Sequence, residues 1–319
     1  FIEPGKGAIA PEPDWLMRDD TPANWAWRPV WRPAYADCEI DVSGDLAGAD
    51  IQRWLVFADE AGLCDQVAAR LGAAGHEVIV VRAGDSFVRV ADKSYVLSPE
   101  RGRDGYDALI ADLTARDMVP DRILHGWLAT TRDGFRPGSS SFHRNLEQGV
   151  FSLLSLAQAM GDEGWTHDIH LTALTSGAVQ VADERLTHPE KAALAGPVRV
   201  IGREFANVSV ATLDLDLPQA KGRGAPDLTR HLHAVLEEIL APPQTLEAAL
   251  RGDKRFEMRW RPLPLEAPHT GAARIRPGAT VLITGGLGGI GLTLARRLAE
   301  TVGARVALLS RGGVPNRGE

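Results

Sequence analysis

The chain has 319 residues, of which 44% are hydrophobic, enough for one large domain or two ordinary ones that each bury a core. The 35 Lys and Arg residues against 42 Asp and Glu give a formal net charge of -7, which excludes a general attraction to nucleic acid or to an anionic membrane. Apolar runs are too short for a membrane span and the N-terminus carries no basic-then-apolar signal, so we expect a cytoplasmic protein. Two cysteines, Cys38 and Cys64, are too few for a disulfide scaffold or a zinc site, and we predict no metal site.

The N-terminal region has the composition of a linker. Residues 1–24 hold four prolines and little apolar periodicity, so we expect a linker that follows an upstream domain. Behind it, Trp25, Trp27 and Trp31 are evenly spaced, which places them on one side of a strand. We predict that this strand pairs with the strand around Phe256 to Trp260, because each carries an aromatic face that needs covering.

From about residue 53, short β-rich runs alternate with amphipathic segments. In the first helix, Leu63, Val67 and Leu71 recur every four residues. The pattern predicts strands over 54–58, 76–81, 122–125, 167–174, 208–215 and 255–263, a hairpin over 86–98, and helices over 63–74, 106–117, 145–160 and 227–240. This alternation indicates an α/β fold with a doubly wound, mainly parallel sheet.

A second βαβ unit opens near the C-terminus. Strand 280–284 leads through a glycine-rich turn to helix 292–300 and strand 305–311, after a Pro/Gly/Ala-rich linker over 265–277. One such unit cannot bury its sheet alone, so we expect the chain to be cut inside its second domain.

The glycine-rich turn is the strongest chemical signal. It follows a strand, opens a helix and can be read as GxGxxG or as TGxxxGxG, a spacing that lets backbone amides approach a pyrophosphate. Where a second strand ends, an arginine favours the 2′-phosphate of NADPH over the ribose hydroxyl of NADH. The predicted cofactor-binding residues are Thr284, Gly285, Gly286, Leu287, Gly288, Gly289, Ile290, Gly291, Ser310 and Arg311.

The corresponding turn of the first domain has the opposite character. After strand 54–58 the sequence reads Asp59, Glu60, Ala61, Gly62, with two carboxylates where a phosphate would sit. Like charges repel, so the larger domain is expected to bind no nucleotide.

These segments carry a family resemblance. TVLITGGLGGIGLTLARRLAE followed by VALLSRGG resembles the start of the catalytic half of ketoreductase domains in modular type I polyketide synthases, within the short-chain dehydrogenase/reductase superfamily. The segments NWAWRPVW, HPEKAALAGPVRVIGREFANV and LEAALRGDKRFEMRWRPL are similar to the preceding linker and structural subdomain of that family. The resemblance implies a truncated Rossmann-like structural subdomain over 25–264 that braces a catalytic subdomain, of which 278–319 is the NADPH-binding start.

No catalytic residue is assigned to this chain. Short-chain reductases use a tyrosine, a lysine four residues later and a serine, and none of Tyr35, Tyr95 and Tyr106 has that lysine. Ser176 follows strand 167–174, where such folds place the serine, but Pro189 and Ala193 stand where the tyrosine and lysine would follow. Ser176 is therefore interpreted as a polar strand end, and the resemblance places the catalytic residues beyond Glu319.

The resemblance implies a parent enzyme that reduces a β-ketoacyl group on an acyl carrier protein to β-hydroxyacyl with NADPH. Implied partners are the rest of the catalytic subdomain, the carrier protein with its phosphopantetheine-bound acyl chain, and a neighbouring acyltransferase domain. The resemblance implies that this acyltransferase domain precedes the linker of residues 1–24. Two alternatives remain open, a non-catalytic scaffold region of an inactive ketoreductase and a free-standing short-chain NADPH reductase.

Overall fold

A computed structural model describes residues 20–46, 48–131, 140–218, 227–265 and 275–312. The chain divides into two units, one of Pro29–Arg261 and one of Phe1–Arg28 with Pro262–Glu319. Most of the two predicted linkers, namely residues 1–19 and 266–274, lies outside the described residues.

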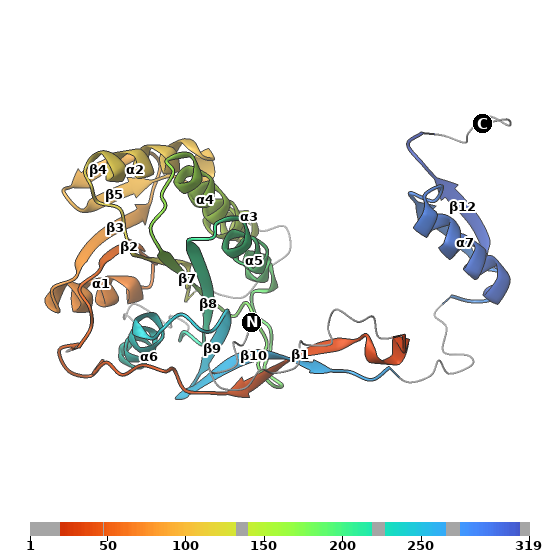
Figure 1. Ribbon diagram of the computed structural model, residues 1–319, viewed down its shortest axis with the longest axis horizontal. Helices are drawn as coiled ribbons and strands as arrows, with labels where there is room; N and C mark the ends of the chain where they lie inside the picture. Colours follow the sequence, from red (N-terminus) through yellow and green to blue (C-terminus); the bar gives the residue numbers. More distant parts are fainter. Residues whose placement is uncertain (1–19, 47, 132–139, 219–226, 266–274, 313–319) are drawn as a thin grey trace, which may run out of the picture. The chain divides into compact units, whose positions relative to one another are not determined.

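Ten strands form one mixed sheet, with the spatial order β1-β10-β9-β8-β7-β6-β2-β3-β5-β4 (Figure 1). The strands are β1 Trp27–Pro33, β2 Arg53–Phe57, β3 Glu77–Ala83, β4 Val88–Ala91, β5 Ser94–Leu97, β6 Arg122–Leu128, β7 Ile169–Ser176, β8 Val208–Leu215, β9 Glu247–Arg251 and β10 Lys254–Pro262.

Seven neighbouring strands of this sheet, β5-β3-β2-β6-β7-β8-β9, are parallel. When these seven strands are numbered by their occurrence along the chain, their spatial order is 3-2-1-4-5-6-7. The first six positions are those of the Rossmann fold. The expected doubly wound sheet is confirmed. The fold is reduced between β3 and β5, where the antiparallel edge strand β4 takes the place of a crossover helix.

Helices cover both faces of the sheet. α2, α4 and α5 contribute to one apolar core, and α1 and α6 contribute to the other. Strand β2 serves both, because Leu55 and Phe57 enter the first core while Trp54 and Val56 enter the second. The helices are α1 Leu63–Ala73, α2 Asp104–Ala115, α3 Ser140–Leu146, α4 Ser152–Asp162, α5 Ala195–Glu204 and α6 Thr229–Leu240, with short turns η2 Pro22–Asn24, η3 Pro99–Arg101, η4 Glu147–Phe151 and η5 Pro189–Leu194.

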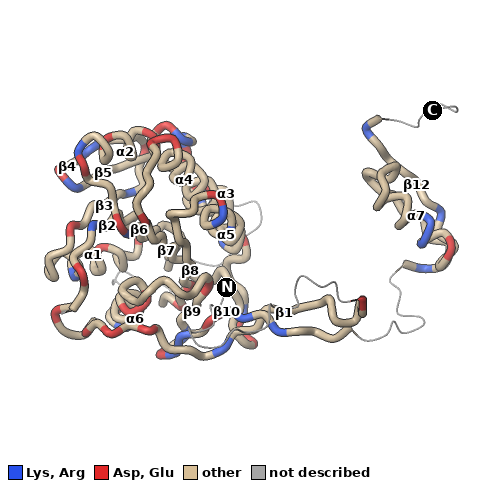
Figure 2. The backbone as a smooth tube through the Cα atoms, in the orientation of Figure 1, with Lys and Arg blue, Asp and Glu red and all other residues tan. Residues whose placement is uncertain are grey.

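Charge avoids the middle of the sheet. The strand β7 carries no Lys, Arg, Asp or Glu, and charged residues concentrate in the surrounding helices and loops (Figure 2). Near-continuous apolar strands of this kind are expected where both faces of a parallel sheet are covered. Among the described residues, none of the helices has both the length and the apolar composition that a membrane crossing requires.

The pairing predicted between the N-terminal tryptophan strand and the C-terminal strand is confirmed, because β1 and β10 are neighbours in the sheet. The reason given for it was wrong, since Trp27 and Trp260 each remain 55% exposed. The backbone of Ala34 donates to the Arg255 carbonyl at 3.1 Å, so odd-numbered residues of β1 direct their backbone groups away from β10. Pro29 and Pro33 occupy such positions, where a missing N–H costs no ladder hydrogen bond and blocks strand addition at this edge.

One predicted helix differs in its interior. Instead of an uninterrupted helix over 145–160, α3 begins at Ser140, a π-helical segment follows over Glu147–Phe151, and α4 continues from Ser152. Gly149 lies in the π segment, and a Cβ added there would approach Leu128 Cδ1 to 2.6 Å. A side chain at this position would therefore force the buried Leu128 side chain to move.

Gly126 provides a test of the packing between β6 and α1. A Cβ at Gly126 would lie 2.2 Å from Cys64 Sγ and 2.9 Å from the Phe57 carbonyl oxygen. We expect Gly126→Ala to lower the free energy of unfolding by about 1–3 kcal/mol, because the backbone of β2 cannot move aside. In α5, Gly196 has no atom within 4 Å of such a Cβ, so Gly196→Ala should be neutral or stabilising by about 0.5–1 kcal/mol. Urea denaturation of both variants measures the difference, and equal effects would contradict the packing argument.

Candidate functional site: two strand-to-helix turns

The predicted cofactor-binding residues lie in a separate βαβ unit. Strand β11 (Thr280–Thr284) and strand β12 (Arg305–Leu309) are parallel, and helix α7 (Gly289–Val302) connects them. The register pairs Thr284 with Leu309, and the Gly286 amide donates to the Leu309 carbonyl at 3.0 Å. The glycine-rich turn and the end of β12 are therefore neighbours.

The glycines of the turn have distinct roles. Gly285 has a φ of +68°, a conformation that favours glycine. A Cβ at Gly286 or at Gly291 would lie 2.7 Å from a backbone carbonyl oxygen, so these two glycines permit close packing of the turn and helix. Gly289 has no atom within 4 Å of an added Cβ. It therefore faces open space at the start of α7.

The first turn of α7 offers backbone donors. The first intrahelical hydrogen bond runs from the Leu292 amide to the Gly288 carbonyl at 2.9 Å. The amides of Gly289, Ile290 and Gly291 precede this bond, and such N-terminal amides, together with the helix dipole, favour an anion. The residues present thus fit the pyrophosphate of a dinucleotide.

Ser310 and Arg311 directly follow β12, and Arg311 is exposed. Because Leu309 contacts the glycine-rich turn, the structure brings both residues to the edge that carries the turn. No carboxylate occurs between Arg305 and Gly312. The arginine side chain can therefore meet a phosphate without a competing acidic residue in that strand end.

The equivalent turn of the larger unit is occupied by its own carboxylate. Asp59 is only 4% exposed, and its two oxygens accept hydrogen bonds from the amides of Leu63 at 3.1 Å and Cys64 at 2.6 Å. These amides open α1. The sequence predicted repulsion of a phosphate here; the structure adds that the amides which would bind the phosphate already have an acceptor.

A buried lysine that the sequence analysis missed closes the same edge of the sheet. Lys191 is 1% exposed, and its Nζ lies 2.9 Å from the Leu128 carbonyl, 2.8 Å from Thr130 Oγ1, 3.1 Å from the Ser176 carbonyl and 3.0 Å from Ser176 Oγ. Burial lowers the pKa of Lys191 from 10.5 to about 8. The ammonium therefore joins the carboxyl ends of β6 and β7.

The reason for the omission is the spacing. Pro189 and Ala193 stand at the spacing expected for the tyrosine and the lysine, whereas the lysine that reaches Ser176 stands between them. A lysine directly before the small and apolar run of residues 192–196 was the available signal. Ser176 Oγ also accepts from the Thr130 amide at 2.9 Å and donates to the Thr130 carbonyl at 2.7 Å, so it is a bonded strand end, as interpreted.

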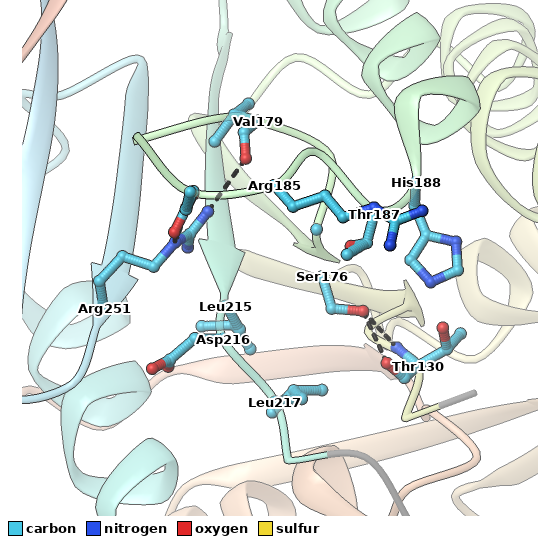
Figure 3. Close-up of a pocket in the computed structure, with 12 residues that line it drawn as sticks. Thr130, Ser176, Val179, Arg185, Thr187, His188, Leu215, Asp216, Leu217 and Arg251 are labelled. Carbon is cyan, nitrogen blue, oxygen red and sulfur yellow. Dashed lines mark hydrogen bonds and ion pairs between the residues drawn. The ribbon is translucent and has the colours of Figure 1, made fainter. Parts of the chain in front are cut away.

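A cavity of about 190 Å³ remains at this edge (Figure 3). Ser176 and Thr130 line one side of it, and Arg251 lines another, where its guanidinium donates to the Val179 carbonyl at 3.1 Å. Arg251 is also paired with Asp214 and Glu184, both at 2.7 Å. The charges of Arg251, Asp214 and Glu184 are thus matched with one another. Over the described residues, no three His, Cys, Asp or Glu side chains are grouped so that they could hold a metal ion.

The geometry defines a class of protein with two parts. One is a Rossmann-type sheet in which a carboxylate of the chain binds the helix amides at the nucleotide edge, and the other is a βαβ unit with an open glycine-rich turn. Comparison with known proteins is consistent with it. Residues 52–227 match a family described as "Beta-ketoacyl synthase-like, N-terminal", and residues 279–319 match the KR domain.

Among solved structures, A-type ketoreductases from a modular polyketide synthase are 25% identical with a TM-score of 0.53, over 92% of this chain and 54% of theirs. An N-terminal ketoreductase from the macrolactin assembly line has a TM-score of 0.64 at 18% identity, over 91% of this chain and 54% of that chain.

Curated relatives are modular polyketide synthases. Polyketide synthase GfsA of Streptomyces halstedii is 30% identical over 91% of this chain, which corresponds to 3% of that protein. Pikromycin polyketide synthase component PikAIII of Streptomyces venezuelae is 29% identical over 91% of this chain and 15% of its own length. The chain belongs to the ketoreductase region of modular polyketide synthases, and it spans a small part of these relatives.

The buried ammonium predicts a pH-dependent stability. Between about pH 8 and pH 10.5 the unfolded chain binds a proton at Lys191 that the folded chain has released, so the free energy of unfolding should rise with pH in this window, by at most about 1.4 kcal/mol per pH unit. Below pH 8 both states are protonated and the contribution is constant. We expect the free energy of unfolding of the wild type, minus that of Lys191→Met, to increase over this window in a series of urea denaturations. A difference that stays flat from pH 7 to pH 10.5 would contradict the assignment.

Proposed function

We propose that this chain supplies the structural subdomain and the pyrophosphate-binding start of the catalytic subdomain of a ketoreductase that uses NADPH. The observation that carries the proposal is the contrast between two equivalent turns, one filled by Asp59 and one open at Gly289. In the parent, NADPH would supply a hydride to the β-keto carbon of an acyl chain on an acyl carrier protein. A neighbouring acyltransferase domain and a cytoplasmic setting belong to the same proposal.

The two units have different roles because their strand-to-helix turns differ. The larger unit, with its nucleotide edge closed by Asp59 and Lys191, acts as a brace that binds no nucleotide. The amides of Gly289, Ile290 and Gly291 bind the pyrophosphate, and Arg311 with Ser310 binds the 2′-phosphate. The coverage of only 3% and 15% of the relatives favours a multidomain parent over a free-standing reductase.

The 319-residue chain should not itself turn over substrate. None of its three tyrosines is followed four residues later by a lysine, so no such pair protonates the developing alkoxide. We expect no NADPH consumption above a no-enzyme control when the purified chain is mixed with a β-ketoacyl thioester. Measurable turnover would show that the catalytic residues have been misplaced. A parent whose downstream residues lack the serine and YxxxK would instead favour the scaffold alternative.

The preference of the parent enzyme for NADPH or NADH tests the roles proposed for Arg311 and Gly289. Arg311→Ala removes a charged hydrogen bond to the 2′-phosphate worth about 1.5–3 kcal/mol, so the NADPH Michaelis constant should rise roughly ten- to hundredfold while that for NADH changes little. Gly289→Val should impair both cofactors alike, because the branched side chain would meet the pyrophosphate rather than the protein.

Steady-state kinetics with both cofactors separates these outcomes, and circular dichroism shows that the variants fold. Gly286→Val is the contrasting variant, since a Cβ there would also lie 2.9 Å from Leu308 Cβ and should disturb the fold itself. Equal losses for NADPH and NADH in Arg311→Ala would mean that this arginine is only a surface charge.

A further inference from the structure

The opposite edge of the large sheet holds a second cavity, of about 390 Å³, at the amino ends of β6, β7 and β8. Arg122, His170 and Ser209, from the first two residues of these strands, line it, together with Asp121 and Asp168. Nothing in the proposed reductase function uses these groups.

Among the described residues, the Arg122 guanidinium forms no salt bridge. Its Nε donates to Gln52 Oε1 at 3.3 Å, and its Nη1 is buried without a hydrogen-bond partner among the described residues. Burial lowers the pKa of Arg122, with Asp121 acting weakly in the opposite direction. Asp121 is already engaged, because its Oδ2 accepts from the Arg53 amide at 2.8 Å. A partly desolvated guanidinium without an ion pair is electrostatically costly, and a nearby anion in the cavity would reduce this cost.

His170 lines the cavity as a neutral side chain. Burial and the nearby Arg122 charge lower the pKa of His170 to about 4, so the imidazole is neutral at pH 7. Its Nδ1 lies 2.7 Å from Ser209 Oγ. A neutral imidazole and a hydroxyl can assist an anion without adding charge.

The two aspartates limit the charge of a ligand. Asp168 is exposed at the cavity lining and Asp121 is half-buried, so a dianion would be repelled more than a monoanion. A carboxylate carries a single charge and can accept a charge-assisted hydrogen bond from a guanidinium.

We propose that this cavity binds the carboxylate group of a small organic acid, with Arg122 as its counter-ion. The site is separate from the glycine-rich turn, and its failure would leave the proposed function untouched.

The experiment is a titration of the 319-residue chain with acetate at constant ionic strength. The imidazole resonances of His170 are followed by NMR and assigned with His170→Gln. We expect a saturable shift and a higher pKa of His170 in the presence of acetate, because a nearby anion stabilises the protonated ring. Inorganic phosphate is the second probe and should bind more weakly at a pH where it is a dianion.

Variants with opposite expected effects make the test sharp. Arg122→Gln should weaken acetate binding by about tenfold or more, whereas Asp168→Asn should strengthen it severalfold because it removes a repelling charge. Asp183→Asn, an exposed carboxylate outside the cavity lining, is the charge-matched control and should leave the affinity unchanged.

Absence of a saturable shift with acetate, or tighter binding of phosphate, would overturn the proposal. Should Arg122→Gln fail to fold, the exposed position of Asp168 lets Asp168→Asn decide, and an affinity for acetate equal to that of Asp183→Asn would also overturn it.

Discussion

The hydrogen bonds of the Asp59 carboxylate to the first amides of α1 decide what the large sheet can do. In a parallel sheet of this order, the turn after the first strand points helix amides toward the place where a pyrophosphate binds. Here the amides of Leu63 and Cys64 are satisfied within the chain. A phosphate would have to displace a buried carboxylate and would lose more electrostatically than it gained.

Charges of both signs complete this closure. Lys191 binds the carbonyls of Leu128 and Ser176 at the ends of two central strands, and Arg251 pairs with Asp214 at the end of β8. Asp214 is buried and Arg251 is partly buried, so removing either partner of this ion pair would leave an uncompensated charge. At the edge where related sheets bind ligands, hydrogen bonds and ion pairs of the chain itself thus hold the strand ends together.

Much of the large sheet could be predicted from the sequence because its signals are local. The four-residue spacing of Leu63, Val67 and Leu71 identifies α1, and all three are fully buried. The π segment around Gly149 could not be predicted, because it depends on contact with Leu128 from another element. The role of Lys191 likewise depends on its hydrogen bond to the Leu128 carbonyl, which is more than 60 residues away in sequence. Charge at Asp59 was visible, but its hydrogen bonds to helix amides required the folded turn.

The two strand-to-helix turns resemble each other in their surroundings and differ in their hydrogen bonds. Both place a helix N-terminus at the end of a parallel strand, and both use a glycine with positive φ, Gly62 in one and Gly285 in the other. They differ in whether a side chain of the turn reaches the amides. A carboxylate does so in the first turn, whereas in the second the position at Gly289 has no side chain and no neighbour within 4 Å. An anion site at such a turn therefore depends on leaving the amides unpaired, a property set by one or two residues that can change while the surrounding sheet is retained.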